Sequence, residues 1–117
     1  MTEPRLIDYL THILTAIERI SGYAAGLDAA GFATDERTQD AVIRNIEVIG
    51  EASRRIQARH PEFAVEHPEL PLASAYQMRN AVAHGYFEVD VDIVWKTVVN
   101  DLPSLAELVR ALLAAEN

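Results

Sequence analysis

Four side chains able to do chemistry lie close together in the stretch MRNAVAHGYFEVD, residues 78–90: Arg79, Asn80, His84 and Tyr86. An arginine guanidinium matches the geometry of a phosphate, and a histidine can move a proton near neutral pH. An RNA 2′-hydroxyl that attacks its own adjacent phosphate needs a base for the hydroxyl and a cation for the charge that builds on the phosphoryl oxygens. The stretch is therefore a candidate site for chemistry on RNA that requires no metal.

On an ideal helix these side chains do not share one face. Asn80 and His84 are four residues apart and lie together, whereas Arg79 and His84 are five apart and diverge by about 140°. Either the long arginine side chain bends around the helix end, where Gly85 breaks the regularity, or a second copy of the chain completes the site. Tyr86 lies within reach in both arrangements.

The same residues also have a purely structural interpretation. A protonated His84 would be stabilised at the C-terminus of a helix, Arg79 would pair with a carboxylate, and Tyr86 would pack with its hydroxyl outward. Short polar motifs often match by chance. The four residues alone leave both interpretations open.

The spacing of apolar residues predicts the helices that must carry this stretch. One apolar stripe predicts a helix over about residues 3–25, with Pro4 in its first turn, and a second stripe predicts a helix over about 35–59, with Thr34 or Asp35 as its N-cap. The stretch itself belongs to a third helix, predicted from about Leu72 to Gly85, which is well placed as the residue just past the helix end.

The remainder of the chain predicts connectors and a helical C-terminal part. Three prolines between residues 60 and 71 indicate a connector with at most one short turn. A fourth helix begins near Asp90, and Pro103 should kink or restart it before a final amphipathic segment. No long alternating segment predicts a strand. We therefore expect an all-α, up-and-down bundle of four to five helices, whose long helices favour a homodimer.

Composition restricts the class of protein. The chain has 117 residues, which suits a single domain over residues 1–117, and it contains no cysteine. It shows neither a membrane-spanning segment nor a signal peptide, so we expect a cytoplasmic protein. The net charge of −8 disfavours nucleic-acid binding, although the cluster Arg54, Arg55 and Arg59 leaves room for a local basic site.

The stretch RNAVAHGY resembles the R-x4-H-x-Y motif of the HepT ribonuclease toxins, a branch of the HEPN superfamily. The segments AVIRNIEVIGEASRRI (residues 41–56) and YFEVDVDIVWKTVVNDLPSL (residues 86–105) are similar to HepT sequences in order and spacing. The resemblance covers most of the chain. One departure is Tyr76, where many relatives have tryptophan three residues before the motif arginine.

This resemblance implies a homodimeric HEPN-like bundle that cleaves RNA without a metal or cofactor. It implies that Arg79 and His84 are the catalytic pair and that Asn80 supports them. It also implies a partner, a minimal nucleotidyltransferase antitoxin, which transfers AMP onto Tyr86 and so excludes substrate by bulk and negative charge. The alternative is a catalytically inactive helical dimer that serves as a binding partner of the nucleotidyltransferase.

Other residues with chemical potential favour ordinary roles. Glu51 could orient Arg79, but a solvated acid on a helix is equally compatible with the sequence. His60 and His67 lack a third residue for a metal site, and His12 is expected on the polar side of its helix. Trp95 has the spacing of a core or interface residue.

Overall fold

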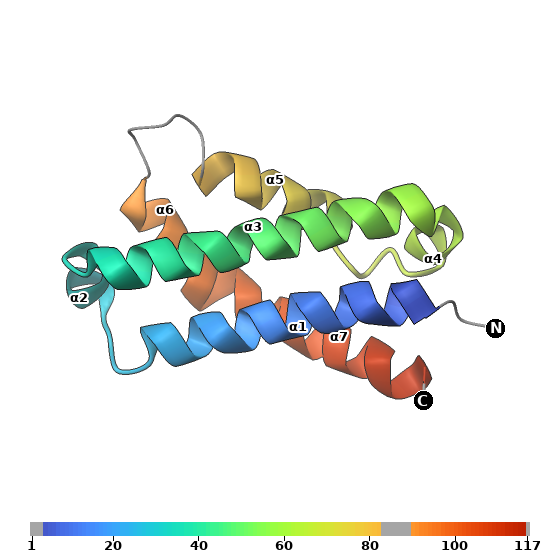
Figure 1. Ribbon diagram of the computed structural model, residues 1–117, viewed down its shortest axis with the longest axis horizontal. Helices are drawn as coiled ribbons and strands as arrows, with labels where there is room; N and C mark the ends of the chain where they lie inside the picture. Colours follow the sequence, from blue (N-terminus) through green and yellow to red (C-terminus); the bar gives the residue numbers. More distant parts are fainter. Residues whose placement is uncertain (1–3, 83–89, 117) are drawn as a thin grey trace.

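The computed structural model describes residues 4–82 and 90–116, and over these residues it contains helices and no strands (Figure 1). The longer helices are α1 (Pro4–Ala24), α3 (Glu36–Arg59), α5 (Leu72–Val82) and α7 (Leu102–Glu116). Successive long helices run in opposite directions, as Figure 1 shows. The predicted all-α, up-and-down bundle is confirmed.

Short elements connect the long helices: α2 (Ala29–Ala33), α4 (Pro61–Glu66), α6 (Val91–Lys96) and a π-helical turn, η1 (Thr97–Asp101). Helix α3 is central, because it packs on both α1 and α5, while α1 also packs on α7. No helix within residues 4–82 and 90–116 is long and apolar enough to cross a membrane.

Two helices begin at the aspartates that the sequence marks as starts. The Asp35 carboxylate caps α3, accepting hydrogen bonds from the Thr38 backbone N–H at 3.1 Å and the Thr38 hydroxyl at 2.8 Å. These bonds favour the charged carboxylate, so they lower the pKa of Asp35. Asp90 caps α6 in the same way, accepting from the backbone N–H groups of Asp92 and Ile93. The predicted starts are confirmed.

Of the two short helices α2 and α4, only α4 corresponds to an element expected from the sequence. Helix α2 was not predicted, since five residues that include Gly31 are too few to show a period; the Asp28 carboxylate caps it by accepting from Gly31 N–H at 2.7 Å. Helix α4 is the single short turn expected in the connector, and Pro61 occupies its first position.

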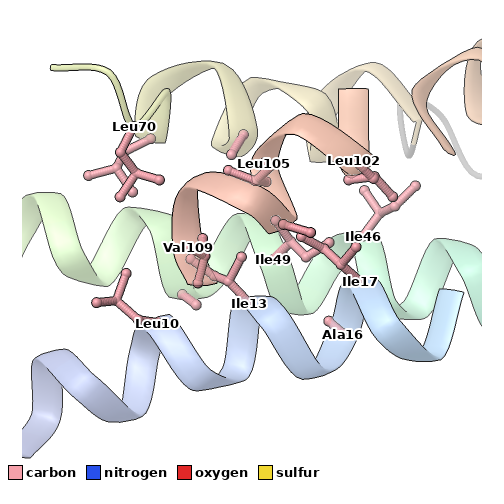
Figure 2. Close-up of a cluster of buried hydrophobic side chains, with 14 of the residues drawn as sticks. Leu10, Ile13, Ala16, Ile17, Ile46, Ile49, Leu70, Leu102, Leu105 and Val109 are labelled. Carbon is pink, nitrogen blue, oxygen red and sulfur yellow. The ribbon is translucent and has the colours of Figure 1, made fainter. Parts of the chain in front are cut away.

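Apolar side chains from α1, α3 and α7 meet in one core (Figure 2). Ile13 and Ile17 project from α1, Ile46 and Ile49 from α3, and Val109 from α7, and each is at most 3% exposed. The four isoleucines lie on the apolar stripes predicted for their helices. Val109 lies within the predicted final amphipathic segment. Two buried polar side chains on α3 are satisfied locally, because Asn45 donates to the Ala41 carbonyl and Ser53 to the Ile49 carbonyl.

The irregularity predicted at Pro103 takes the form of η1. The Leu102 N–H bonds to the Thr97 carbonyl, five residues back, and the Thr97 hydroxyl donates to the Ile93 carbonyl at 2.9 Å. Helix α7 then continues through Pro103, which falls in its first turn and has no N–H to lose. The π-turn thus joins α6 to α7 without a loop.

Exposed large apolar side chains are few on the long helices of the described chain. Those more than 40% exposed are Tyr23 on α1, Val65 on α4, Ile93 on α6 and Val99 on η1. The homodimer was expected because long helices in a short chain commonly present more apolar surface than one bundle covers. On α1 and α3 that surplus is largely absent, because the bundle itself covers their apolar stripes. The exposed apolar residues concentrate instead around α6 and η1.

Candidate functional site

Arg79 lies in the last turn of α5, against the middle of α3. Its aliphatic stem crosses α3 at Gly50: a Cβ added to that glycine would lie 2.8 Å from Arg79 Cβ and 3.2 Å from Arg79 Cδ. The separation of 2.8 Å is shorter than real Cβ atoms show, so a larger residue at position 50 would force α5 or its side chain to shift. Gly50 therefore determines where the Arg79 side chain begins.

The guanidinium of Arg79 rests over an aromatic ring. Its Cζ is 5.9 Å from the ring centroid of Tyr76, one turn earlier on α5, which is within cation–π range. No carboxylate of the described residues forms an ion pair with Arg79. The pairing required by the purely structural interpretation is thus not seen among residues 4–82 and 90–116, and no carboxylate of that part of the chain occupies the N–H edges of the guanidinium.

Arg79 lines a pocket of about 510 Å³ that we name the α1–α3 pocket. Helix α1 contributes three residues, α3 contributes six and α5 contributes Arg79: Arg5, Tyr9, His12, Arg44, Glu47, Val48, Glu51, Ala52, Arg55 and Arg79. Four arginines face two glutamates, although the chain as a whole carries a net charge of −8. The pocket is therefore a locally basic site on an acidic protein.

Within the pocket, Glu51 orients a different arginine from the one considered in the sequence. Glu51 Oε1 accepts a hydrogen bond from Arg55 Nε at 3.0 Å and lies 3.8 Å from Nη1 of Arg54. The bond to Glu51 is the main reason why the pKa of Arg55 is raised, and the nearby Tyr9 hydroxyl adds to the effect. Glu51 makes no ion pair with Arg79, so of the two roles that the sequence left open for Glu51, the one of orienting Arg79 is not seen.

The structure places only part of the predicted motif. Arg79 is half-buried in the α1–α3 pocket, while Asn80 is exposed and does not line it. His84 and Tyr86 lie outside the described residues. So does Gly85, the predicted end of the third helix.

Arg5, Arg44 and Gly50 are site residues that the sequence analysis missed. Their signals were present: Arg44 and Glu51 lie seven residues apart on one face of α3, and a glycine inside a helix costs about 1 kcal/mol unless close packing requires it. What was missing was the knowledge that α1, α3 and α5 are neighbours.

The histidines of the described chain have ordinary contacts. His67 Nδ1 lies 3.0 Å from Glu69 Oε2, and its ring packs on Phe63. His60 meets the edge of the Tyr9 ring, and exposed His12 lines the α1–α3 pocket. Within residues 4–82 and 90–116, no group of three or more histidines and carboxylates is arranged to hold a metal ion. Trp95 packs on Phe32 at the core, as predicted.

Comparison with known sequences decides the family. The sequence model described as "Ribonuclease HepT-like" matches residues 13–112. The chain belongs to the HepT-like ribonuclease family. A protein of Thermococcus cleftensis named "Probable ribonuclease HepT" is 45% identical over 98 residues, which cover 84% of this HepT-like chain and 86% of the relative. A relative from Caldanaerobacter subterraneus subsp. tengcongensis is 32% identical over 116 residues, 99% of both chains.

A solved structure confirms the fold of this HepT-like protein. The HEPN toxin of Shewanella oneidensis, tri-AMPylated and in complex with an MNT antitoxin, superimposes with a TM-score of 0.70. The match covers 97% of this chain and 99% of the other at 21% identity. The HEPN-like bundle expected from the sequence is therefore confirmed.

Proposed function

We propose that this HepT-like protein is a metal-independent endoribonuclease and the toxin of a toxin–antitoxin pair. The observation that carries the proposal is the position of Arg79: its guanidinium has no carboxylate partner among the described residues and opens onto a basic pocket of an acidic protein. A phosphate is the ligand that such a group suits best. The family supplies the reaction class, cleavage of RNA.

In the proposed reaction, His84 takes the proton of a ribose 2′-hydroxyl, whose oxygen attacks the adjacent phosphorus. The bond from phosphorus to the 5′-oxygen breaks, the leaving oxygen gains a proton, and a 2′,3′-cyclic phosphate remains. Arg79 stabilises the negative charge that builds on the phosphoryl oxygens. The five-residue offset between Arg79 and His84 is accommodated in a homodimer, where a second copy completes the site and Asn80 supports the pair.

The test is cleavage of a single-stranded RNA by the purified protein with EDTA present. We expect a cyclic phosphate product, and a loss of roughly 10²–10³-fold in kcat for Arg79→Gln, because one charge-stabilising group is removed. His84→Ala should lose activity as well, while Arg19→Gln, an exposed change elsewhere on α1, should not. Cleavage that EDTA abolishes and magnesium restores would contradict the mechanism.

We further propose control by a nucleotidyltransferase partner that transfers AMP to Tyr86. The Tyr86 phenolic oxygen attacks the α-phosphorus of ATP, loses its proton, and pyrophosphate leaves. The Shewanella oneidensis HEPN toxin, which shares this fold, is described as tri-AMPylated and bound to an MNT antitoxin. An AMP group two residues from His84 would add bulk and negative charge at the site, and Arg79 could bind its phosphate in place of substrate.

Peptide mass spectrometry after incubation with the partner and ATP tests this control. We expect added AMP on the peptide that contains Tyr86 and no silencing of Tyr86→Phe by AMP transfer. Modification of a different residue, with Tyr86 untouched, would contradict the assignment. The acidic net charge favours the alternative function, an inactive dimer that only binds the nucleotidyltransferase partner. The alternative would be supported if the wild-type protein bound the partner but cleaved no RNA.

A further inference from the structure

The α1–α3 pocket extends beyond Arg79 onto residues that the proposed cleavage step does not use. Its α1 wall is formed by Arg5, Tyr9 and His12, at positions four and three residues apart on one face of the helix. These residues precede position 13, where the match to the family begins.

Arg5 repeats the arrangement of Arg79. Its Cζ lies 6.0 Å from the ring centroid of Tyr9, as the Cζ of Arg79 lies 5.9 Å from that of Tyr76. Neither arginine forms an ion pair with a described carboxylate. A guanidinium over a ring keeps its N–H donors at its edge, where an anion can accept them. The pocket thus contains two arginines prepared for an anion in the same way.

Tyr9 and Arg55 also line the α1–α3 pocket. Tyr9 is 5% exposed, and its buried hydroxyl makes no hydrogen bond of standard length and angle with any described residue. The hydroxyl lies near Arg55 and contributes to the raised pKa of that residue, but a buried polar atom that lacks a well-formed hydrogen bond is costly. A hydroxyl can accept from a guanidinium and donate to an anion at the same time. Glu51 already holds Nε of Arg55. If an anion oxygen lay beside Arg55, rotation of the Tyr9 hydroxyl would let it accept a hydrogen bond from the guanidinium and donate one to the anion.

We propose that the α1–α3 pocket is a second phosphate-binding subsite for the RNA strand, in which Arg5 and Arg55 bind a backbone phosphate other than the one bound by Arg79. The inference rests on the proposed ribonuclease function and adds residues to it. A pocket of about 510 Å³ falls within the roughly 300–1,000 Å³ usual for small-ligand sites. The subsite also offers a way for a chain with a net charge of −8 to bind RNA, since four arginines and only two glutamates line this pocket.

Binding of a ten-nucleotide, single-stranded RNA with 2′-O-methyl groups tests the subsite without cleavage. We expect Arg5→Gln and Arg55→Gln each to weaken binding about five- to tenfold, and to reduce the slope of log affinity against log salt by about 0.7, because one phosphate contact is lost. Arg19→Gln is the matched control, since Arg19 is exposed on the same helix and does not line the pocket. Circular dichroism and thermal unfolding confirm that each variant folds.

A length comparison gives a second readout. A dinucleoside monophosphate contains only the cleaved phosphate, so Arg5→Gln should lower kcat/KM for it much less than for the ten-nucleotide unmodified RNA. For the ten-nucleotide unmodified RNA the same variant should raise KM and leave kcat nearly unchanged, because the subsite binds the strand and takes no part in the bond changes.

The outcomes separate the subsite from the proposed function. Wild-type protein that binds the methylated strand with the expected dependence on Arg5, but cleaves no RNA, would support the subsite and contradict the ribonuclease. If the wild-type protein cleaves RNA but Arg5→Gln and Arg19→Gln bind the methylated strand equally well, the subsite is overturned and the ribonuclease function is still supported. The subsite would also be overturned if the methylated strand did not bind to wild-type protein even at low salt. The same conclusion would follow if Arg5→Gln bound RNA normally but no longer bound a protein partner.

Discussion

Gly50 is the residue on which the position of Arg79 most directly depends. We expect Gly50→Ala to force α5 away from α3, because the new methyl would meet Arg79 Cβ at 2.8 Å. The free energy of unfolding should fall by about 1–3 kcal/mol from overpacking, and RNA cleavage should fall at least about tenfold as the guanidinium shifts. Urea unfolding and a cleavage assay measure the two effects.

Gly22→Ala is the control: nothing lies within 4 Å of that position in α1, so stability should rise slightly. Unchanged cleavage by Gly50→Ala would contradict the role of the glycine.

Asp35 gives a pH-dependent prediction at the same scale. Its hydrogen bonds from Thr38 lower the pKa in the folded protein below the ordinary value of 3.8. The carboxylate therefore stabilises the fold above about pH 3.8, and the contribution is lost as the pH falls through the lower, folded-state pKa. We expect Asp35→Ala to lower the thermal midpoint at pH 7 and the difference from wild type to narrow below pH 3.8. Asp35→Asn, which caps without titrating, should show a weaker pH dependence. A difference that stays constant down to pH 2 would contradict this account.

At the scale of elements, the packing of α3 between its neighbours accounts for most of the fold. Ile46 is fully buried where α1, α3 and α7 meet. We expect Ile46→Val to reduce the free energy of unfolding by about 0.5–1.5 kcal/mol and Ile46→Ala by about 2–5 kcal/mol, since each leaves a larger cavity. Urea titrations measure both. Val65→Ala on α4, where the side chain is 79% exposed, is the control and should change little. Equal stability of Ile46→Ala and wild type would show that the core is not formed as described.

The helices also show which parts of the fold and of the site could be predicted from the sequence alone. Helices α1 and α3 were predicted within a residue at each end, because long apolar stripes and the cap at Asp35 are local signals. Helix α2 and the π-helical turn η1 were not predicted. Five residues are too few to show a period, and a π-turn differs from an α-helix only in its hydrogen bonds. The same limit applies to the site: Arg79 could be identified from its motif, whereas Arg5 and Gly50 join it only through contacts between helices.

At the scale of the whole molecule, we expect two copies to associate. In the proposed mechanism a second copy accommodates the offset between Arg79 and His84, and exposed Ile93 and Val99 lie on the elements that follow the motif. Light scattering at micromolar concentration should give twice the chain mass of 13.0 kDa. Val99→Glu should shift the mass toward the monomer and reduce cleavage together, while Val65→Glu, on exposed α4, should do neither. A monomeric wild-type protein that cleaves RNA would contradict the shared site.

The contact between Trp95 and Phe32, whose ring centroids are 5.2 Å apart, provides the molecule with an internal optical reporter. Trp95 is the chain's one tryptophan, so its fluorescence comes from a single place, where α2 meets α6. Helix α6 begins directly after the stretch that carries His84 and Tyr86. We therefore expect changes in emission wavelength or quenching to follow unfolding, and the proposed RNA binding and AMP transfer, on the same unlabelled protein in real time.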